Sequence, residues 1–239
     1  MANLHARKVV VIGGASGIGF AVARAALDDG AQVVIASSQT SNVDAAVKRL
    51  GAGASGSAVD VRNEEDVQRF FAGIGGLDHL VYTAGDWGRA PGGGSIAEMD
   101  LAAAAQAFTV RFWGALAAIK HAGPRMAAGG SITLTDGLMA HRPPKGAAVA
   151  SAMLGAIEHL TRGLAVDLAP LRVNAVCPGL ILTERSRRMP EEMLKRYTAT
   201  TPLARGGEPA EVAEAYLYLM RAGYTTGQVL LVDGGLSVV

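Results

Sequence analysis

Short runs of β-branched and aliphatic residues alternate with longer alanine-rich stretches along most of the chain. The runs have the length of strands, and the stretches between most of them carry apolar residues at helical spacing. The predicted strands are KVVVIG (8–13), QVVIAS (32–37), GSAVDV (56–61), LDHLVYT (77–83), GSITLT (130–135), LRVNAVC (171–177) and GQVLLV (227–232). Two glycine-rich pieces, 51–57 and 88–95, fall inside this rhythm and are interpreted as loops. The alternation predicts an α/β fold, a doubly wound seven-stranded parallel sheet covered by helices on both faces.

Composition and charge fit a single domain that binds small molecules. The chain has 239 residues, 50% of them hydrophobic, which is enough to bury one sizeable core over residues 1–239. Its formal net charge is only +1, so neither nucleic acid nor an anionic membrane is expected as a partner. The apolar run at 9–12 is too short for a signal-peptide core, and a cytoplasmic protein is expected. The single cysteine, Cys177, excludes an internal disulfide and a cysteine-based metal cage, and no metal site is predicted.

The first candidate for chemistry lies between the first predicted strand and the helix after it. The stretch VVVIGGASGIGFAVARAAL places Gly13, Gly17 and Gly19 at this turn. Glycines let the backbone approach a phosphate, and a helix N-terminus offers free N–H groups and positive potential. A tight turn alone also favours glycine, but a strand before the turn and an amphipathic helix after it favour a dinucleotide site.

The glycine spacing, G-x-x-x-G-x-G, resembles that of the short-chain dehydrogenase/reductase family. Three later segments resemble the family in the right order: LVYTAGDWG (80–88), LAVDLAPLRVNAVCPGLILTE (164–184) and YTTGQVLLVDGG (224–235). The resemblance runs the whole length and implies a Rossmann fold, a nicotinamide cofactor, oxidoreductase activity and a homodimer or homotetramer. It also implies the cofactor-binding residues Gly13, Ser16, Gly17, Ile18, Gly19, Ala84, Gly85, Pro178, Gly179, Ile181 and Thr183.

The end of the second predicted strand indicates which nicotinamide cofactor is used. Family members that use NAD usually carry an acidic residue there, which accepts the ribose hydroxyls and repels a 2′-phosphate. Here the sequence is IASSQTSN, in which Ser37, Ser38 and Gln39 can donate to a phosphate, so NADP is expected. By the same resemblance Asp60 and Val61 flank the adenine; the alternative for Asp60 is a cap on the helix that begins near residue 63 or 64.

The resemblance breaks at the family's catalytic positions. The tyrosine and lysine expected on the helix after the fifth strand fall on Ala150 and Leu154, and the expected serine falls on Gly137. The expected asparagine falls on Arg111, within TVRFWGAL. Ordinary proton donation by a tyrosine is therefore not available at these positions.

Asp136 and Arg111 are the candidate catalytic residues that replace them. Asp136 ends the fifth predicted strand, where ligands bind in doubly wound sheets, although a carboxylate that only shapes the TDG turn is the alternative. Arg111 lies in an apolar helix and needs a partner, first Asp136 and second Asp86; the alternative is a buried structural ion pair. His141 and Lys145 are expected on a solvated loop.

A segment at about 183–205 falls where the family places its substrate lid. Its arginines Arg185, Arg187 and Arg188 either attract an acidic substrate or belong to a solvated face shared with glutamates.

Three functions are compatible with these residues. The first is NADPH-dependent reduction of an activated, iminium-type carbon, which needs no strong proton donor; Asp136 then stabilises the substrate cation and Arg111 keeps Asp136 ionised. Divergent family members with an arginine–aspartate pair resemble this arrangement. The second is carbonyl reduction with Asp136, His141, Lys145 or water as the acid. The third is a cofactor-binding protein without redox turnover.

Overall fold

The computed structural model describes residues 3–85 and 95–239, and they form one seven-stranded parallel sheet. The strands are β1 (Lys8–Ile12), β2 (Gln32–Ser37), β3 (Ala54–Ala58), β4 (Leu77–Tyr82), β5 (Met126–Thr135), β6 (Arg172–Pro178) and β7 (Val229–Val232). Their order in the sheet is β3-β2-β1-β4-β5-β6-β7, and all neighbours are parallel. The predicted single-domain Rossmann sheet is confirmed.

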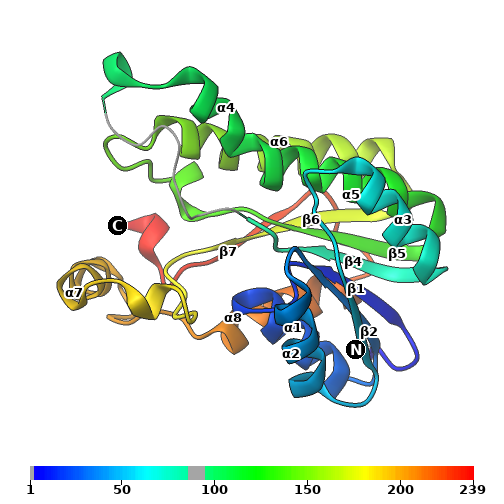
Figure 1. The fold of residues 1–239 in the computed structure, drawn as a ribbon. Helices are drawn as coiled ribbons and strands as arrows, with labels where there is room; N and C mark the ends of the chain where they lie inside the picture. Colours follow the sequence, from blue (N-terminus) through cyan, green and yellow to red (C-terminus); the bar gives the residue numbers. More distant parts are fainter. Residues whose placement is uncertain (1–2, 86–94) are drawn as a thin grey trace.

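Helices cover both faces of the sheet (Figure 1). One face carries α1 (Gly17–Asp28), α2 (Thr40–Leu50) and α8 (Pro209–Arg221); the other carries α3 (Glu64–Ile74), α4 (Leu101–Phe108), α5 (Gly114–Ala122) and α6 (Ala148–Asp167). The alternation of side chains along β1 explains why both layers form. Val9 and Val11 join the core under α1 and α8, whereas Val10 and Ile12 join the core under α3 and α5.

One strand lies two residues earlier than its sequence predicts. β3 pairs Ala54 to Ala58 with Val33 to Ser37 of β2, instead of covering 56–61. β3 is one of the two edge strands, and its small residues are exposed or only partly buried. The apolar signal at Val59 therefore marks the buried residue just after the strand and not the strand itself.

The helical stretch that carries Arg111 is interrupted by a π-helical turn. The turn η2 (Thr109–Trp113) joins α4 to α5, and the stretch ends in the 3-10 turn η3 (Gly123–Arg125). By length and composition alone, Leu101–Arg125 is apolar enough to cross a membrane, with a mean hydropathy of 1.2. Its α5 part buries Ala115, Ala118, Ile119 and Ala122 in the hydrophobic core of the domain.

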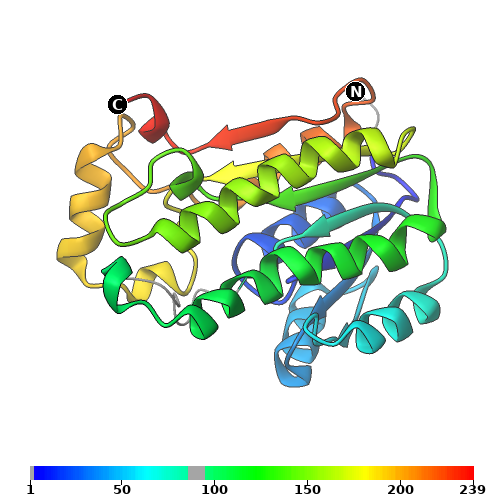
Figure 2. The same ribbon diagram turned by 90° about the horizontal axis from the view of Figure 1, so that it is seen from above.

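The order of the strands positions the site. It reverses between β1 and β4, and ligands bind at such a switch point beside the carboxyl ends of the strands. Helix α7 (Glu191–Thr200) lies beyond the end toward which the strand arrows point (Figure 2).

Candidate active site

A cleft of about 730 Å³ opens at this switch point. It runs from the turn between β1 and α1, past the carboxyl ends of β2, β4 and β5, to the segment after β6. Its size is in the range of pockets that enclose small-molecule ligands. The cleft brings together segments that lie far apart in the sequence.

The glycine turn is shaped to receive a phosphate. Gly13 has φ +91°, and a Cβ there would lie 2.6 Å from the backbone nitrogen of Ala84. A Cβ on Gly19 would lie 2.3 Å from the carbonyl oxygen of Gly13. Helix α1 begins at Gly17, and its N-cap residue, Ser16, makes no side-chain capping hydrogen bond. The N-terminal donors of α1 are therefore not taken by the cap, which fits the pyrophosphate of a dinucleotide.

A carboxylate sits at this same helix end. The backbone N–H of Gly17 donates to Oε2 of Glu184 at 3.2 Å. Glu184 also lines the cleft and follows Thr183, whose methyl carbon faces Gly17. A negative group thus stands where the glycine turn would hold a phosphate.

Most of the predicted cofactor-binding residues line the cleft. These are Gly13, Ser16, Gly17, Ile18, Gly19, Ser37, Ser38, Asp60, Val61, Ala84, Gly85, Pro178 and Thr183. Three others do not. Gln39 is the exposed residue before α2, Gly179 packs against Asp233, and Ile181 is buried and pairs with Gly207.

Asn42 and Arg62 join Ser37 and Ser38 along the wall of the cleft, and sequence reasoning missed both. Arg62 pairs with Asp60, with 2.7 Å between Nη2 and Oδ2, and this hydrogen bond lowers the pKa of the Asp60 carboxyl. Arg62 could have been found as the basic residue directly after AVDV. It was missed because the choice of cofactor was argued only from the residues after the second predicted strand. The alternative interpretation of Asp60 as a helix cap is wrong, because Asn63 caps α3 by accepting from the N–H of Glu65 at 3.0 Å.

The two positions of α6 at which the sequence predicts the loss of the family's tyrosine and lysine hold apolar side chains. Leu154 is fully buried, and Ala150 is partly buried. Within residues 3–85 and 95–239, no tyrosine or lysine side chain lines the cleft. Lys145 is exposed and lies outside it.

Arg111 reaches the cleft from the π-helical turn. Its residue is 3% exposed, and its Nη1 donates to the backbone oxygen of Thr135 at 3.0 Å. Burial lowers the pKa of the guanidinium, whereas the nearby Tyr82, Tyr216 and Asp136 act in the opposite direction. Gly85 makes room for the side chain, since a Cβ there would lie 2.1 Å from Nη2 of Arg111.

Asp136 follows β5 directly, and its backbone N–H donates to Val176 at 2.9 Å. The side chain is fully buried, and neither carboxyl oxygen accepts a hydrogen bond of normal geometry from a described residue. Burial raises the pKa of this carboxyl to about 8, and the neighbouring Glu158 adds to the shift, while the Gly137 N–H and the Cys177 thiol oppose it. A buried carboxyl favours the neutral form because ionisation would lose solvation.

The expected direct ion pair between Arg111 and Asp136 is not formed. Both residues line the cleft, but Arg111 donates to the backbone of Thr135 and not to the carboxyl oxygens of Asp136. The two groups interact through their charges only. Asp86, the second expected partner, lies outside the described residues.

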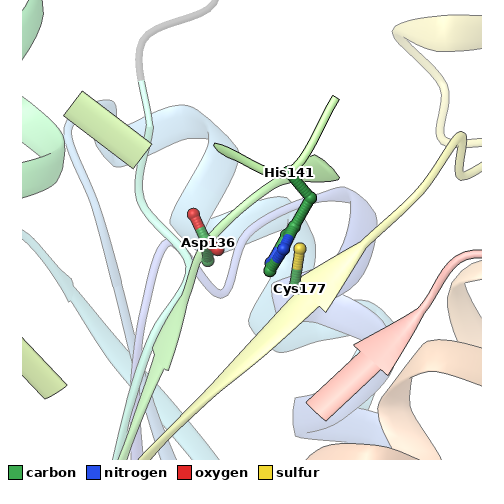
Figure 3. A group of neighbouring side chains, drawn as sticks. All are labelled: Asp136, His141 and Cys177. Atoms are coloured by element: carbon green, nitrogen blue, oxygen red, sulfur yellow. The ribbon is translucent and has the colours of Figure 1, made fainter. Parts of the chain in front are cut away.

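His141 contacts a buried carboxylate that sequence reasoning did not consider. It follows the 3-10 turn η4 (Leu138–Ala140), and its Nε2 lies 2.6 Å from Oε1 of Glu158 on α6. Donor atoms of Asp136, His141 and Cys177 lie within 4.8 Å of one another. Figure 3 shows the imidazole turned back toward the strand ends, beside the Cys177 thiol. His141 is exposed on the loop after η4, as expected, and in addition its ring contacts Glu158.

The predicted lid segment takes part in the cleft through two of its arginines. Arg185 and Arg188 line the cleft, whereas Arg187 pairs with Glu208 at 2.7 Å. Arg187 thus belongs to a solvated pair, while the other two stand where an anionic ligand would approach.

Comparison with known proteins identifies the family. A family model described as "Enoyl-(Acyl carrier protein) reductase" matches residues 13–237. The chain is 36% identical to "Short-chain dehydrogenase/reductase ATR9" of Stachybotrys chlorohalonatus, over 98% of each chain. The structure of MalC Reductase/Diels-Alderase from Malbranchea aurantiaca superimposes with a TM-score of 0.91 at 31% identity, covering 99% of this chain and 98% of that one. A small-chain dehydrogenase in complex with NADPH superimposes with a TM-score of 0.84 at 34% identity, covering 98% and 100%. The chain therefore belongs to the short-chain dehydrogenase/reductase family of oxidoreductases.

Proposed function

We propose that the protein is an NADPH-dependent reductase of small molecules with an electron-poor, iminium-type carbon. One observation carries the proposal: a fully buried carboxyl, that of Asp136, lines the cleft without a hydrogen bond of normal geometry from any described residue. A cationic substrate beside it would favour the ionised carboxylate and pair with it.

The residues of the cleft fit a nicotinamide dinucleotide. The turn from Gly13 to Gly19 offers backbone N–H groups to the pyrophosphate, and Ser37, Ser38, Asn42 and Arg62 surround the end of β2, where a 2′-phosphate would lie. No acidic residue follows β2 before Asp44, and a similar dehydrogenase has been solved in complex with NADPH. NADP is therefore the proposed cofactor.

A titration with a substitution at β2 tests this preference. Wild type should bind NADPH more tightly than NADH, and Ser38→Asp should reverse the order by repelling the 2′-phosphate. Ser38→Ala is the matched control, since it removes the hydroxyl without adding charge. Equal dissociation constants in wild type would contradict the proposed cofactor.

The proposed chemistry follows from two features of the described cleft: no tyrosine lines it, and the carboxyl of Asp136 does. Bound NADPH would supply a hydride. An iminium carbon becomes a neutral amine on accepting hydride, so no tyrosine is needed to protonate an alkoxide. Asp136 in its ionised form would orient and stabilise the cationic substrate, and its raised pKa means that cation binding would drive proton release.

Carbonyl reduction is the second candidate, and the raised pKa of Asp136 favours it. The raised pKa favours the protonated form of this carboxyl, and a neutral carboxylic acid in the cleft can donate a proton to a developing alkoxide. The alternative of a cofactor-binding protein without turnover has no support from the comparisons.

The pH dependence of kcat/KM separates the two reactions. The probes are an N-alkyl cyclic iminium salt, whose charge is fixed, and a ketone of similar size, assayed by NADPH consumption from about pH 6.5 to 9.5. Iminium reduction should rise as pH passes the pKa of Asp136, because the carboxylate is the active form. Ketone reduction should fall over the same range, because the acid is the active form. Turnover of neither probe would contradict the proposed function.

The remaining expectations are part of the same proposal. We propose a cytoplasmic homo-oligomer, a dimer or a tetramer, with small molecules as its other partners. Sedimentation velocity of the purified protein tests the oligomeric state, and a monomer at micromolar concentration would contradict it.

A further inference from the structure

The cluster behind Asp136 contains two buried acidic side chains and one histidine. Glu158 lies on α6 with its side chain only 10% exposed, and its Oε1 is 2.6 Å from Nε2 of His141. The imidazole is 32% exposed and is also within 4.8 Å of the Asp136 carboxyl. His141 therefore lies close to both carboxyls at a partly exposed position, and the two carboxyls also interact with each other.

The pair of His141 and Glu158 is not part of the cleft wall. Neither His141 nor Glu158 lines the cleft, so neither is placed to touch cofactor or substrate. A glutamate at a buried position of a helix is costly unless its charge is paired. His141 contacts Oε1 of Glu158 from one side, and Arg162, 3.4 Å from Oε2, pairs with the carboxylate from the surface.

We propose that His141 and Glu158 act together as positioning residues that set the charge of Asp136. His141 holds the Glu158 carboxylate and so limits its repulsion of Asp136, while Glu158 keeps the imidazole turned toward the strand ends. The inference deepens the proposed function, because the charge of Asp136 decides whether iminium or carbonyl chemistry is favoured.

Several other ionisable groups lie near Asp136 and affect its charge. Those that face it or its immediate neighbours are Glu158 of α6, His141 after η4, Cys177 of β6, Arg111 of η2, Tyr82 of β4, Tyr216 of α8 and, beyond Cys177, Asp233. Burial raises the pKa of the Cys177 thiol and of both tyrosines, so these three are neutral near pH 7. Arg111 carries positive charge and favours the carboxylate form of Asp136. Glu158 and His141 are therefore the neighbours whose substitution tests what sets the charge of Asp136.

Two substitutions should move Asp136 in opposite directions. Glu158→Gln removes the negative neighbour and should lower the titration midpoint of Asp136. His141→Gln releases Glu158 and should raise the midpoint. Each shift should reach about one pH unit, as is typical for a charge within 4–6 Å. His141→Asn serves as a second variant, and near-UV circular dichroism checks that each protein is folded.

The measurement is ¹³C NMR of the full chain labelled at aspartate carboxyl carbons, with Asp136 assigned by the signal that Asp136→Asn lacks. EDTA is included, because Asp136, His141 and Cys177 are also of the types that bind divalent metals. Matched controls are Glu214→Gln and His159→Gln, both exposed, which should leave the midpoint unchanged.

The outcome separates this inference from the proposed function. Midpoints that move as expected while no iminium or ketone is reduced would support the charge-setting pair and overturn the proposed function. If the protein reduces a probe, but neither substitution changes the pH profile or the titration midpoint of Asp136, the charge-setting role of His141 and Glu158 is overturned. The proposed function is then supported. Shifts in the same direction for both variants would also overturn the pair.

Discussion

A single side chain, that of Glu184, affects how strongly the cleft binds the phosphates of a dinucleotide. Glu184 places its carboxylate on the N–H of Gly17, at the end of α1 where a dinucleotide phosphate would bind. The helix end attracts negative charge, and the carboxylate competes for the same donors. The sequence TERSRR indicated a lid rich in arginine, but the position of one glutamate in that lid depends on how the chain after β6 folds back to α1.

Glu184→Gln should therefore tighten NADPH binding. The substitution removes repulsion of the phosphates and should lower the dissociation constant several-fold, which corresponds to about 1 kcal/mol. Fluorescence titration measures the effect. Glu192→Gln, an exposed residue of α7, is the matched control and should have no effect. An unchanged or weaker affinity in Glu184→Gln would show that Glu184 does not compete with the cofactor.

At the scale of elements, the turn after β4 and the π-helical turn fit together around one guanidinium. Gly85 leaves no room for a Cβ beside Arg111, whereas a Cβ on Gly123, at the end of the same helical stretch, would meet nothing within 4 Å. π-helical turns inside helices are frequent at functional sites.

Gly85→Ala should displace Arg111 and reduce kcat/KM by about tenfold or more, since small errors in positioning charged groups are costly. Gly123→Ala should behave as wild type. Combining Gly85→Ala with Arg111→Met should add little to Arg111→Met alone, because the displaced side chain is then already absent. Additive losses in the double variant would contradict this coupling.

Helix α6 holds apolar side chains at the two positions where the sequence predicts the loss of the family's tyrosine and lysine. Leu154 is fully buried, so restoring a lysine there would bury an unpaired ammonium. Leu154→Lys should lower the free energy of unfolding by about 3 kcal/mol or more in urea titrations. Leu154→Met, similar in volume, should change it by less than about 1.5 kcal/mol. A stable Leu154→Lys protein would show that the helix still has room for the lost residue.

The elements also show what the sequence could and could not predict. Regular alternation located six strands within a few residues, because buried strands carry an apolar signal. It misplaced β3, since an exposed edge strand of small residues has none. Asp136 and Arg111 were predicted as catalytic because they stand at or beside positions where the family pattern fails, and both line the cleft. The pairing of His141 with Glu158 was missed, since it depends on how a loop folds over α6.

At the scale of the whole molecule, the sheet and its two helical layers position the cleft, which lies at the carboxyl ends of the strands. Both hydrophobic cores flank the sheet, and the cleft lies where its strand order reverses. The glycine turn, the β2 end, η2, the residue after β5 and the lid come from widely separated parts of the chain. Their convergence follows from the doubly wound topology, which is why most of the cofactor-binding residues predicted from the family resemblance line one cleft, whereas the fold does not specify the substrate.

The most direct test of the account is the effect of Asp136→Asn on iminium reduction and on NADPH affinity, measured together. We expect kcat/KM to fall by about 10²- to 10³-fold, as for loss of one charge-stabilising group in a dry site. NADPH affinity should stay near wild type. Stability should not fall: the raised pKa of Asp136 destabilises the folded state as pH rises from the ordinary carboxyl range to about 8, and asparagine removes that penalty. Asp167→Asn, on the exposed end of α6, is the control. Full activity in Asp136→Asn would contradict the central claim that this carboxyl acts at the nicotinamide.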